Sequence, residues 1–267
     1  MPRKKVIKFI LGIIFVFVFI SLAVFVIVLK RNYVPPILMY HSITDQPVTT
    51  DMLTVSVGTF RSQMRFLKEH KYNVLPLEEL AKLISQKKRI PARTLAITLD
   101  DGYRDNYLYA YPVLKEYNLP ATIFIITGEV GRPGNDRLDW DEIKAMQSSG
   151  LISFGSHCLG AEPLVNLKSE QGVRQQVFES KRILEEKLGA GVNMFSYPEG
   201  LFNAKIKQMV IDAGYHLAVA TNPGRQYSDD DVFLLKRLRI SENARNLFVF
   251  WFESSGYYSF LKETKKK

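Results

Sequence analysis

The sequence predicts an α/β fold in which strands and helices alternate within one domain. Short apolar segments such as residues 121–126 (ATIFII) carry no charge, which suits strands of a parallel sheet covered on both faces. Amphipathic segments lie between them, and no low-complexity linker or repeat interrupts the alternation. A chain of 267 residues has room for one such domain of about 200–250 residues. The pattern is typical of one βα barrel or one doubly wound sheet.

The individual elements are predicted from the spacing of their apolar residues. The strands are expected at residues 37–40, 73–75, 95–99, 121–126, 152–154, 194–197, 216–220 and 234–240. The helices are expected at residues 59–70, 76–86, 107–117, 139–149, 169–188 and 204–213. Gly150 and Gly189 directly follow two of these helices, where glycine commonly ends a helix. After the first strand, a polar loop is predicted to run to about Val57.

The first 31 residues form a separate segment. Residues 9–29 are an uncharged run of 21 residues, long enough to cross a hydrocarbon core of about 30 Å as a helix. Four basic residues precede this run and only Lys30 and Arg31 follow it, which favours an amino terminus inside the cell and the remainder outside. A cleaved signal peptide is the alternative, but the run exceeds the usual apolar core of about 7–15 residues and no small-x-small site closes it. We therefore expect an uncleaved, single-pass anchor in the cytoplasmic membrane.

The charge and cysteine content exclude two kinds of site. The net charge is +9, but residues 1–31 hold six basic and no acidic residues, which leaves 30 basic against 27 acidic residues elsewhere. Without a basic stripe or a known binding motif, we expect no nucleic-acid partner. Cys158 is the single cysteine, which excludes an internal disulfide framework and a CxxC metal or redox site.

These observations divide the chain into four parts. We expect a basic cytoplasmic segment at residues 1–8, an anchor at 9–29, a folded domain at 35–250 and a C-terminal tail at 251–267. The tail ends in three consecutive lysines, for which a solvated position is expected.

The segment at residues 95–106 (LAITLDDGYRDN) carries the clearest chemical signal. An apolar strand runs into the adjacent carboxylates Asp100 and Asp101, and Gly102 follows. In α/β sheets and barrels, catalytic groups lie at the carboxyl ends of the strands. One carboxylate can bind a metal while its neighbour serves as general base. The structural alternative is an ordinary turn in which an aspartate caps the next helix.

Other predicted strands also end in polar side chains. Because the carboxyl ends of parallel strands meet at one face, we expect these residues to form one site. The residues are His41, Asp100, Asp101, Ser156, His157, Tyr197 and Asn222.

Four motifs, in this order and spacing, resemble those of the polysaccharide deacetylase family, the NodB-homology group of carbohydrate esterases, over residues 35–245. They are ILMYHSI (37–43), TLDDGY (98–103), SFGSHCL (153–159) and FSYPEG (195–200). The first resembles the opening strand of the branch that includes poly-N-acetylglucosamine deacetylases. The resemblance implies a distorted (β/α) barrel, usually of seven strands, and a hydrolase that depends on one divalent metal ion such as zinc, cobalt, nickel or iron.

The resemblance also implies roles for individual residues. Asp101 and His157 match metal ligands, and Asp100 matches the general base that deprotonates water. The oxyanion of the attacked acetamide would rest on the metal and on a backbone N–H, which we assign to Tyr197. The substrate would be an N-acetylglucosamine polymer outside the membrane, and the products would be acetate and a free amine.

This chain departs from the family pattern at two positions. The family usually has a second histidine four or five residues after the first, where this chain has Ala161 and Glu162. The Glu162 carboxylate can complete a metal triad, and the alternative is a solvent-facing loop residue. The late L-x-x-H motif is also not evident, and residues 235–238 (LKRL) stand near its place. His41 is then the candidate general acid, with a purely structural histidine as the alternative.

Two hypotheses follow from this comparison. The first is a membrane-anchored, metal-dependent polysaccharide N-deacetylase. The second is a membrane-tethered glycan-binding protein that kept the barrel and lost the metal site. The retained Asp100–Asp101 pair favours the enzyme, because a binding module has little use for a base beside a metal ligand. The oligomeric state, the metal and the glycan linkage are left open.

Overall fold

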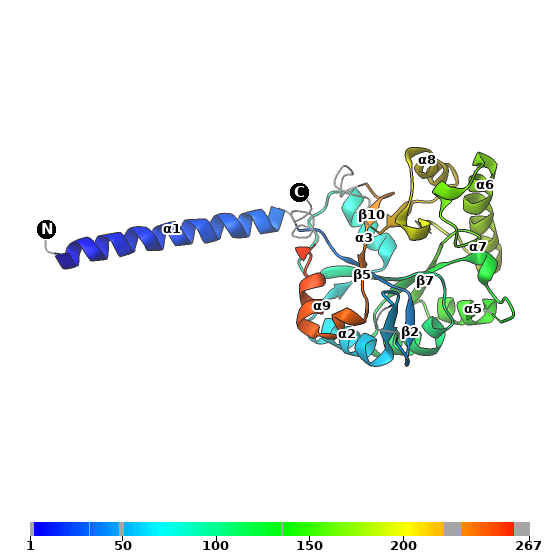
Figure 1. The fold of residues 1–267 in the computed structure, drawn as a ribbon, viewed down its shortest axis with the longest axis horizontal. Helices are drawn as coiled ribbons and strands as arrows, with labels where there is room; N and C mark the ends of the chain where they lie inside the picture. The colour runs from blue at the N-terminus through cyan, green and yellow to red at the C-terminus, as the bar shows by residue number, and fades with distance from the viewer. Residues whose placement is uncertain (1–2, 32, 48–50, 135, 222–230, 259–267) are drawn as a thin grey trace.

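The computed structural model describes residues 3–31, 33–47, 51–134, 136–221 and 231–258 (Figure 1). Side chains of the first helix are described from Ile10 to Phe25. Asn222 and the terminal lysines at 265–267 lie outside the described residues.

A parallel, nearly closed barrel forms the centre of the domain. Its strands follow the order β10-β9-β8-β7-β6-β5-β1-β11, and β4 also pairs with β5. The predicted α/β barrel is therefore confirmed, with eight strands in the main path where about seven were expected. The strands are β1 (Ile37–Tyr40), β4 (Asn73–Val74), β5 (Thr94–Leu99), β6 (Ala121–Ile125), β7 (Ile152–Ser156), β8 (Met194–Ser196), β9 (Leu217–Ala220), β10 (Leu235–Lys236) and β11 (Leu238–Arg239).

The two ends of the sheet meet at one residue. β10 pairs with β9 and β11 pairs with β1, and Arg237 alone separates β10 from β11 along the chain. The prediction of a single strand at residues 234–240 is wrong in this respect, because the chain changes partner at Arg237. This crossing brings the last part of the domain beside the first strand.

Helices cover the outside of the barrel (Figure 1). They are α2 (Val57–Glu69), α3 (Leu77–Ser85), α4 (Tyr111–Tyr117), α5 (Trp140–Ser148), α6 (Glu170–Arg174), α7 (Ser180–Leu188), α8 (Ala204–Asp212) and α9 (Leu247–Glu253). The predicted helices at 107–117 and 169–188 each contain a π-helical turn, η1 (Asn106–Ala110) and η4 (Gln175–Glu179). Asp139 and Glu142 form a capping box that fixes the start of α5.

Alternation along the strands divides the apolar residues into two clusters. Ile123 and Ile125 of β6 belong to the larger cluster, whereas Phe124 belongs to a smaller cluster that includes Leu77 and Leu80 of α3. Gly155 of β7 makes room for the Phe124 ring, since a Cβ there would lie 2.5 Å from a ring carbon. The strands are thus buried on both faces, as their uncharged sequences predict.

A two-stranded sheet lies beside the barrel where a polar loop was predicted. It consists of β2 (Ser42–Thr44) and β3 (Thr54–Ser56), which pair in parallel. The loop prediction is wrong here, because the residues between these strands are polar and gave no apolar period. The pairing places β2 directly after the end of β1, next to η1.

The helix α1 (Arg3–Arg31) projects away from the barrel (Figure 1). Its described side chains are exposed, including Phe15 at 72% and Phe17 at 71%. No helix in the described part of the chain meets both the length and the apolarity needed to cross a membrane. The anchor at residues 9–29 therefore stays a prediction.

Candidate active site

A cavity of about 500 Å³ opens at the carboxyl ends of the strands. Five residues that the sequence predicts for the site line it together: His41, Asp100, Asp101, His157 and Tyr197. The strand ends therefore converge for these five of the seven expected residues. Ser156 does not line the cavity, since its Oγ lies 2.7 Å from Ser180 Oγ, and Asn222 lies outside the described residues. The other lining residues are Met39, Asp51, Met52, Leu53, Ala161, Glu199, Gly200, Thr221 and Arg239.

Asp100 lies at the end of β5, buried to 3% exposure and paired with a guanidinium. Its Oδ1 and Oδ2 accept hydrogen bonds from Nη1 and Nη2 of Arg237, both at 2.6 Å. Arg237 also donates to Ser196 Oγ at 2.9 Å and Thr98 Oγ1 at 3.2 Å. Burial acts to raise the pKa of Asp100, but the charge and hydrogen bonds of Arg237 outweigh it and lower this pKa to about 2. Asp100 is therefore a carboxylate at neutral pH.

Asp101 occupies a strained backbone position, with φ at +70°. Gly102 follows at φ +65°, and a Cβ there would lie 2.9 Å from Ile125 Cδ1. This turn redirects the Asp101 side chain toward His157, whose Nε2 lies 3.4 Å from Asp101 Oδ1. Backbone strain of this kind persists where surrounding structure fixes it, and it is common at functional sites.

His157 is oriented by the backbone of the neighbouring strand. Its Nδ1 lies 2.8 Å from the carbonyl oxygen of Ser196, which can only accept, so Nδ1 carries the proton. Burial acts to lower the pKa of His157, but its hydrogen bond to Asp101 and the charge of Asp100 outweigh burial and raise it. Nε2 is thus directed at the Asp101 carboxylate.

The Asp101–His157 pair fits a divalent cation. When the imidazole is neutral, its Nε2 lone pair faces a carboxylate oxygen at 3.4 Å, an arrangement that a proton or a cation between them stabilises. One cation can contact both atoms at the usual ligand distances of roughly 2.0–2.2 Å. Among the described residues, no group of three His, Cys, Asp or Glu side chains could hold a metal ion.

Glu162 does not join this pair. Its side chain is exposed, and Oε1 accepts a hydrogen bond from Asn166 Nδ2 at 2.9 Å. Ala161, its neighbour, lines the cavity instead. The loop turns the Glu162 carboxylate toward Asn166, which agrees with the alternative of a solvent-facing loop residue, and a ligand role for Glu162 stays a prediction.

His41 follows β1 and is buried to 9% exposure beside the two aspartates. Desolvation lowers the pKa of His41, although the charges of Asp100 and Asp101 act in the opposite direction. Its Nδ1 is buried without a hydrogen-bond partner among the described residues. The position suits proton transfer to a group bound in the cavity, and the role of general acid stays a prediction.

Tyr197 reaches the cavity, but its backbone does not suit the role assigned to it. The Tyr197 amide donates a hydrogen bond to the Val219 carbonyl oxygen at 3.1 Å as part of the barrel. An amide already paired within the sheet is a poor donor for an oxyanion. The structure therefore argues against that hypothesis. The Tyr197 side chain is fully buried, and burial raises the pKa of its hydroxyl far above the ordinary value.

Arg237 is the functional residue that sequence reasoning missed. It lies within the LKRL segment that stands in place of the late histidine motif, yet nothing in that segment separates Arg237 from the other basic residues of the chain. Its side chain is 1% exposed, and its role depends on the crossing between β10 and β11.

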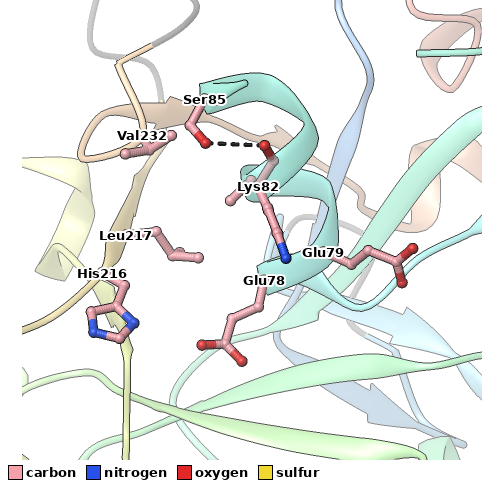
Figure 2. Close-up of a pocket in the computed structure, with 8 residues that line it drawn as sticks. Glu78, Glu79, Lys82, Ser85, His216, Leu217 and Val232 are labelled. Atoms are coloured by element: carbon pink, nitrogen blue, oxygen red, sulfur yellow. Dashed lines mark hydrogen bonds between the residues drawn. The ribbon is translucent and has the colours of Figure 1, made fainter. Parts of the chain in front are cut away.

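A second cavity of about 500 Å³ lies at the opposite, amino-terminal end of the strands. Figure 2 shows Glu78, Glu79 and Lys82 of α3 on one side and His216 on the other. These four side chains are exposed to solvent. The cavity contains none of the predicted site residues at the carboxyl ends of the strands and does not belong to the candidate active site.

Comparisons with known proteins agree with this site. A family model described as polysaccharide deacetylase matches residues 87–218. YxkH of Bacillus subtilis is 34% identical over 206 residues, 77% of this chain and 71% of the relative. The poly-beta-1,6-N-acetyl-D-glucosamine N-deacetylase of Staphylococcus aureus is 30% identical, over 72% of this chain and 69% of the relative.

Solved structures show the same similarity. The deacetylase PplD of Streptococcus pyogenes, solved in complex with acetate, has a TM-score of 0.72 and 30% identity, over 80% of this chain and 96% of that one. IcaB from Ammonifex degensii has a TM-score of 0.72 at 22% identity, over 83% of this chain and 97% of that one, and supports the fold. The chain belongs to the polysaccharide deacetylase family.

Proposed function

We propose that this chain is a metal-dependent hydrolase that removes N-acetyl groups from an N-acetylglucosamine polymer outside the cytoplasmic membrane. The observation that carries the proposal is the buried, ionised Asp100 beside the Asp101–His157 pair in one cavity. The similarity to the Staphylococcus aureus enzyme supports a β-1,6-linked N-acetylglucosamine polymer as substrate.

The residues divide the reaction between them. Asp101 and His157 would hold a divalent cation, which when bound polarises the acetamide carbonyl and makes nearby water more acidic. Asp100 is held by Arg237 in one orientation and accepts the proton of the attacking water. His41 would deliver a proton to the leaving nitrogen from its protonated ring, a form that burial makes more acidic but less populated. Acetate and a free glucosamine nitrogen result.

Acetate release from oligomers of β-1,6-linked N-acetylglucosamine tests this function in the full-length chain. We expect release by the wild type loaded with zinc, cobalt, nickel or iron, and loss by at least a thousandfold in Asp100→Asn. Elemental analysis should find about one metal per chain in both proteins and little in the Asp101→Ala/His157→Ala variant. Binding of the oligomers without acetate release under any metal would contradict the enzyme and support the glycan-binding alternative.

We also propose that residues 9–29 anchor the protein in the membrane, with residues 35–250 outside the cytoplasm. The uncharged sequence and the exposed apolar side chains between Ile10 and Phe25 support an anchor, and the basic residues before it support the orientation. Protease added to intact cells should digest the domain. Protection of the domain in intact cells, with digestion after lysis, would contradict this orientation.

A further inference from the structure

The backbone around His41 is held by two residues that the proposed reaction does not use. Asn106 Nδ2 donates a hydrogen bond to the His41 carbonyl oxygen at 2.8 Å. Ser42 Oγ donates to Asp105 Oδ2 at 2.5 Å, and the Ile43 amide donates to the same carboxylate group. Three consecutive residues, 41–43, are thus bound by two consecutive residues, 105 and 106.

The two binding residues are themselves fixed. Asp105 is 8% exposed and Asn106 is fully buried, and Asn106 Nδ2 also donates to Asp105 Oδ1 at 2.8 Å. They stand at the start of the π-helical turn η1, four residues after Asp101. Turns of this kind are rare and frequently lie at functional sites. The geometry connects the loop that carries the aspartate pair to the segment that carries His41.

His41 depends on this connection because Nδ1 of its ring has no hydrogen-bond partner among the described residues. The packing around this buried ring and the position of its backbone therefore set where the imidazole lies. A displacement of about 1 Å at a reacting group can cost two orders of magnitude in rate. We propose that Asp105 and Asn106 are positioning residues, which hold His41 at the cavity through the backbone of residues 41–43. The proposal rests on the proposed function, in which His41 protonates the leaving nitrogen.

Kinetics of Asp105→Ala, and of the milder Ser42→Ala, test the proposal on the full-length chain. We expect kcat to fall at least tenfold in Asp105→Ala and several-fold in Ser42→Ala, with KM within twofold of the wild type. Ser42→Thr keeps the hydroxyl and should restore most of the loss. Ser153→Ala is the matched control, since it removes a hydroxyl hydrogen bond of 2.8 Å to Thr122 in the same barrel and should leave kcat unchanged.

Nuclear magnetic resonance of the histidine rings supplies a second readout that a general loss of stability would not move. The chain has four histidines, so selective labelling gives four imidazole signals. In Asp105→Ala and Ser42→Ala, the His41 signal should shift or broaden while the His157 signal keeps its position. An unchanged kcat in both variants, or a lower kcat with an unchanged His41 signal, would overturn the proposal.

The two proposals can fail separately. A wild type that releases no acetate from any oligomer would refute the deacetylase function. The His41 signal in the same samples would still show whether Asp105 and Ser42 fix that ring, because its position does not depend on turnover.

Discussion

The two ends of the barrel carry cavities of the same volume, about 500 Å³, but hold their charged residues differently. At the carboxyl ends of the strands, Asp100 and His157 are buried to 3% and 5% exposure and bonded to fixed partners. At the amino ends, Glu79 and His216 are exposed (Figure 2). Burying a charge is costly unless a partner compensates it. The comparison therefore indicates that buried, partnered charge, and not cavity size, marks the site.

Removal of the Arg237 side chain should have the largest effect. Arg237→Ala leaves the Asp100 carboxylate buried without its bidentate partner, which typically costs about 3–5 kcal/mol of folding free energy. We expect loss of deacetylase activity and a lower denaturation midpoint in urea. Arg182→Ala is the control, because it removes an exposed guanidinium that pairs with the carboxylates of Glu179 and Glu186. A similar, small effect of both substitutions would contradict the contrast between buried and exposed charge.

The buried Asp105 should give the domain a measurable pH dependence. Burial raises the pKa of Asp105 from 3.8 to about 6, so between these values the folded protein binds a proton that the unfolded chain has lost. Its contribution to stability is present below pH 4 and is lost as the pH rises through 6, by at most roughly 3 kcal/mol. Asp105→Asn, which does not titrate, should gain stability relative to the wild type between pH 4 and pH 7 in urea denaturation. A constant difference across this range would contradict the raised pKa.

The smallest effects are expected where the charged side chains are exposed. Glu162→Ala should leave metal affinity unchanged in calorimetric titration, because its carboxylate bonds Asn166. His216→Ala, in the cavity at the amino ends, should leave both metal affinity and acetate release unchanged. A tenfold loss of metal affinity in Glu162→Ala would place it among the ligands after all.

The sequence predicts those features of the fold and of the candidate site that depend on a local pattern of residues. The strand before Asp100 is uncharged, and the carboxylates and glycine that follow it mark a strand end, so this part of the site can be predicted from the sequence. The role of Arg237 cannot be predicted in this way, because it depends on a chain crossing that lies 137 residues from its partner Asp100. The direction of the Glu162 side chain depends on its loop, and the occupied amide of Tyr197 depends on pairing between β8 and β9.

Arg237 is the single residue between β10 and β11, and this position affects when the site can form during synthesis and folding of the chain. The strand pairing that closes the barrel and the hydrogen bonds that hold Asp100 form at the same place, from the last strands to leave the ribosome. Contacts between residues so far apart in sequence form slowly, since a long loop must close first. A chain that is unfinished or cut before residue 237 lacks both the closure and the partner of Asp100. The guanidinium that fixes Asp100 is therefore present only in chains that extend past residue 236.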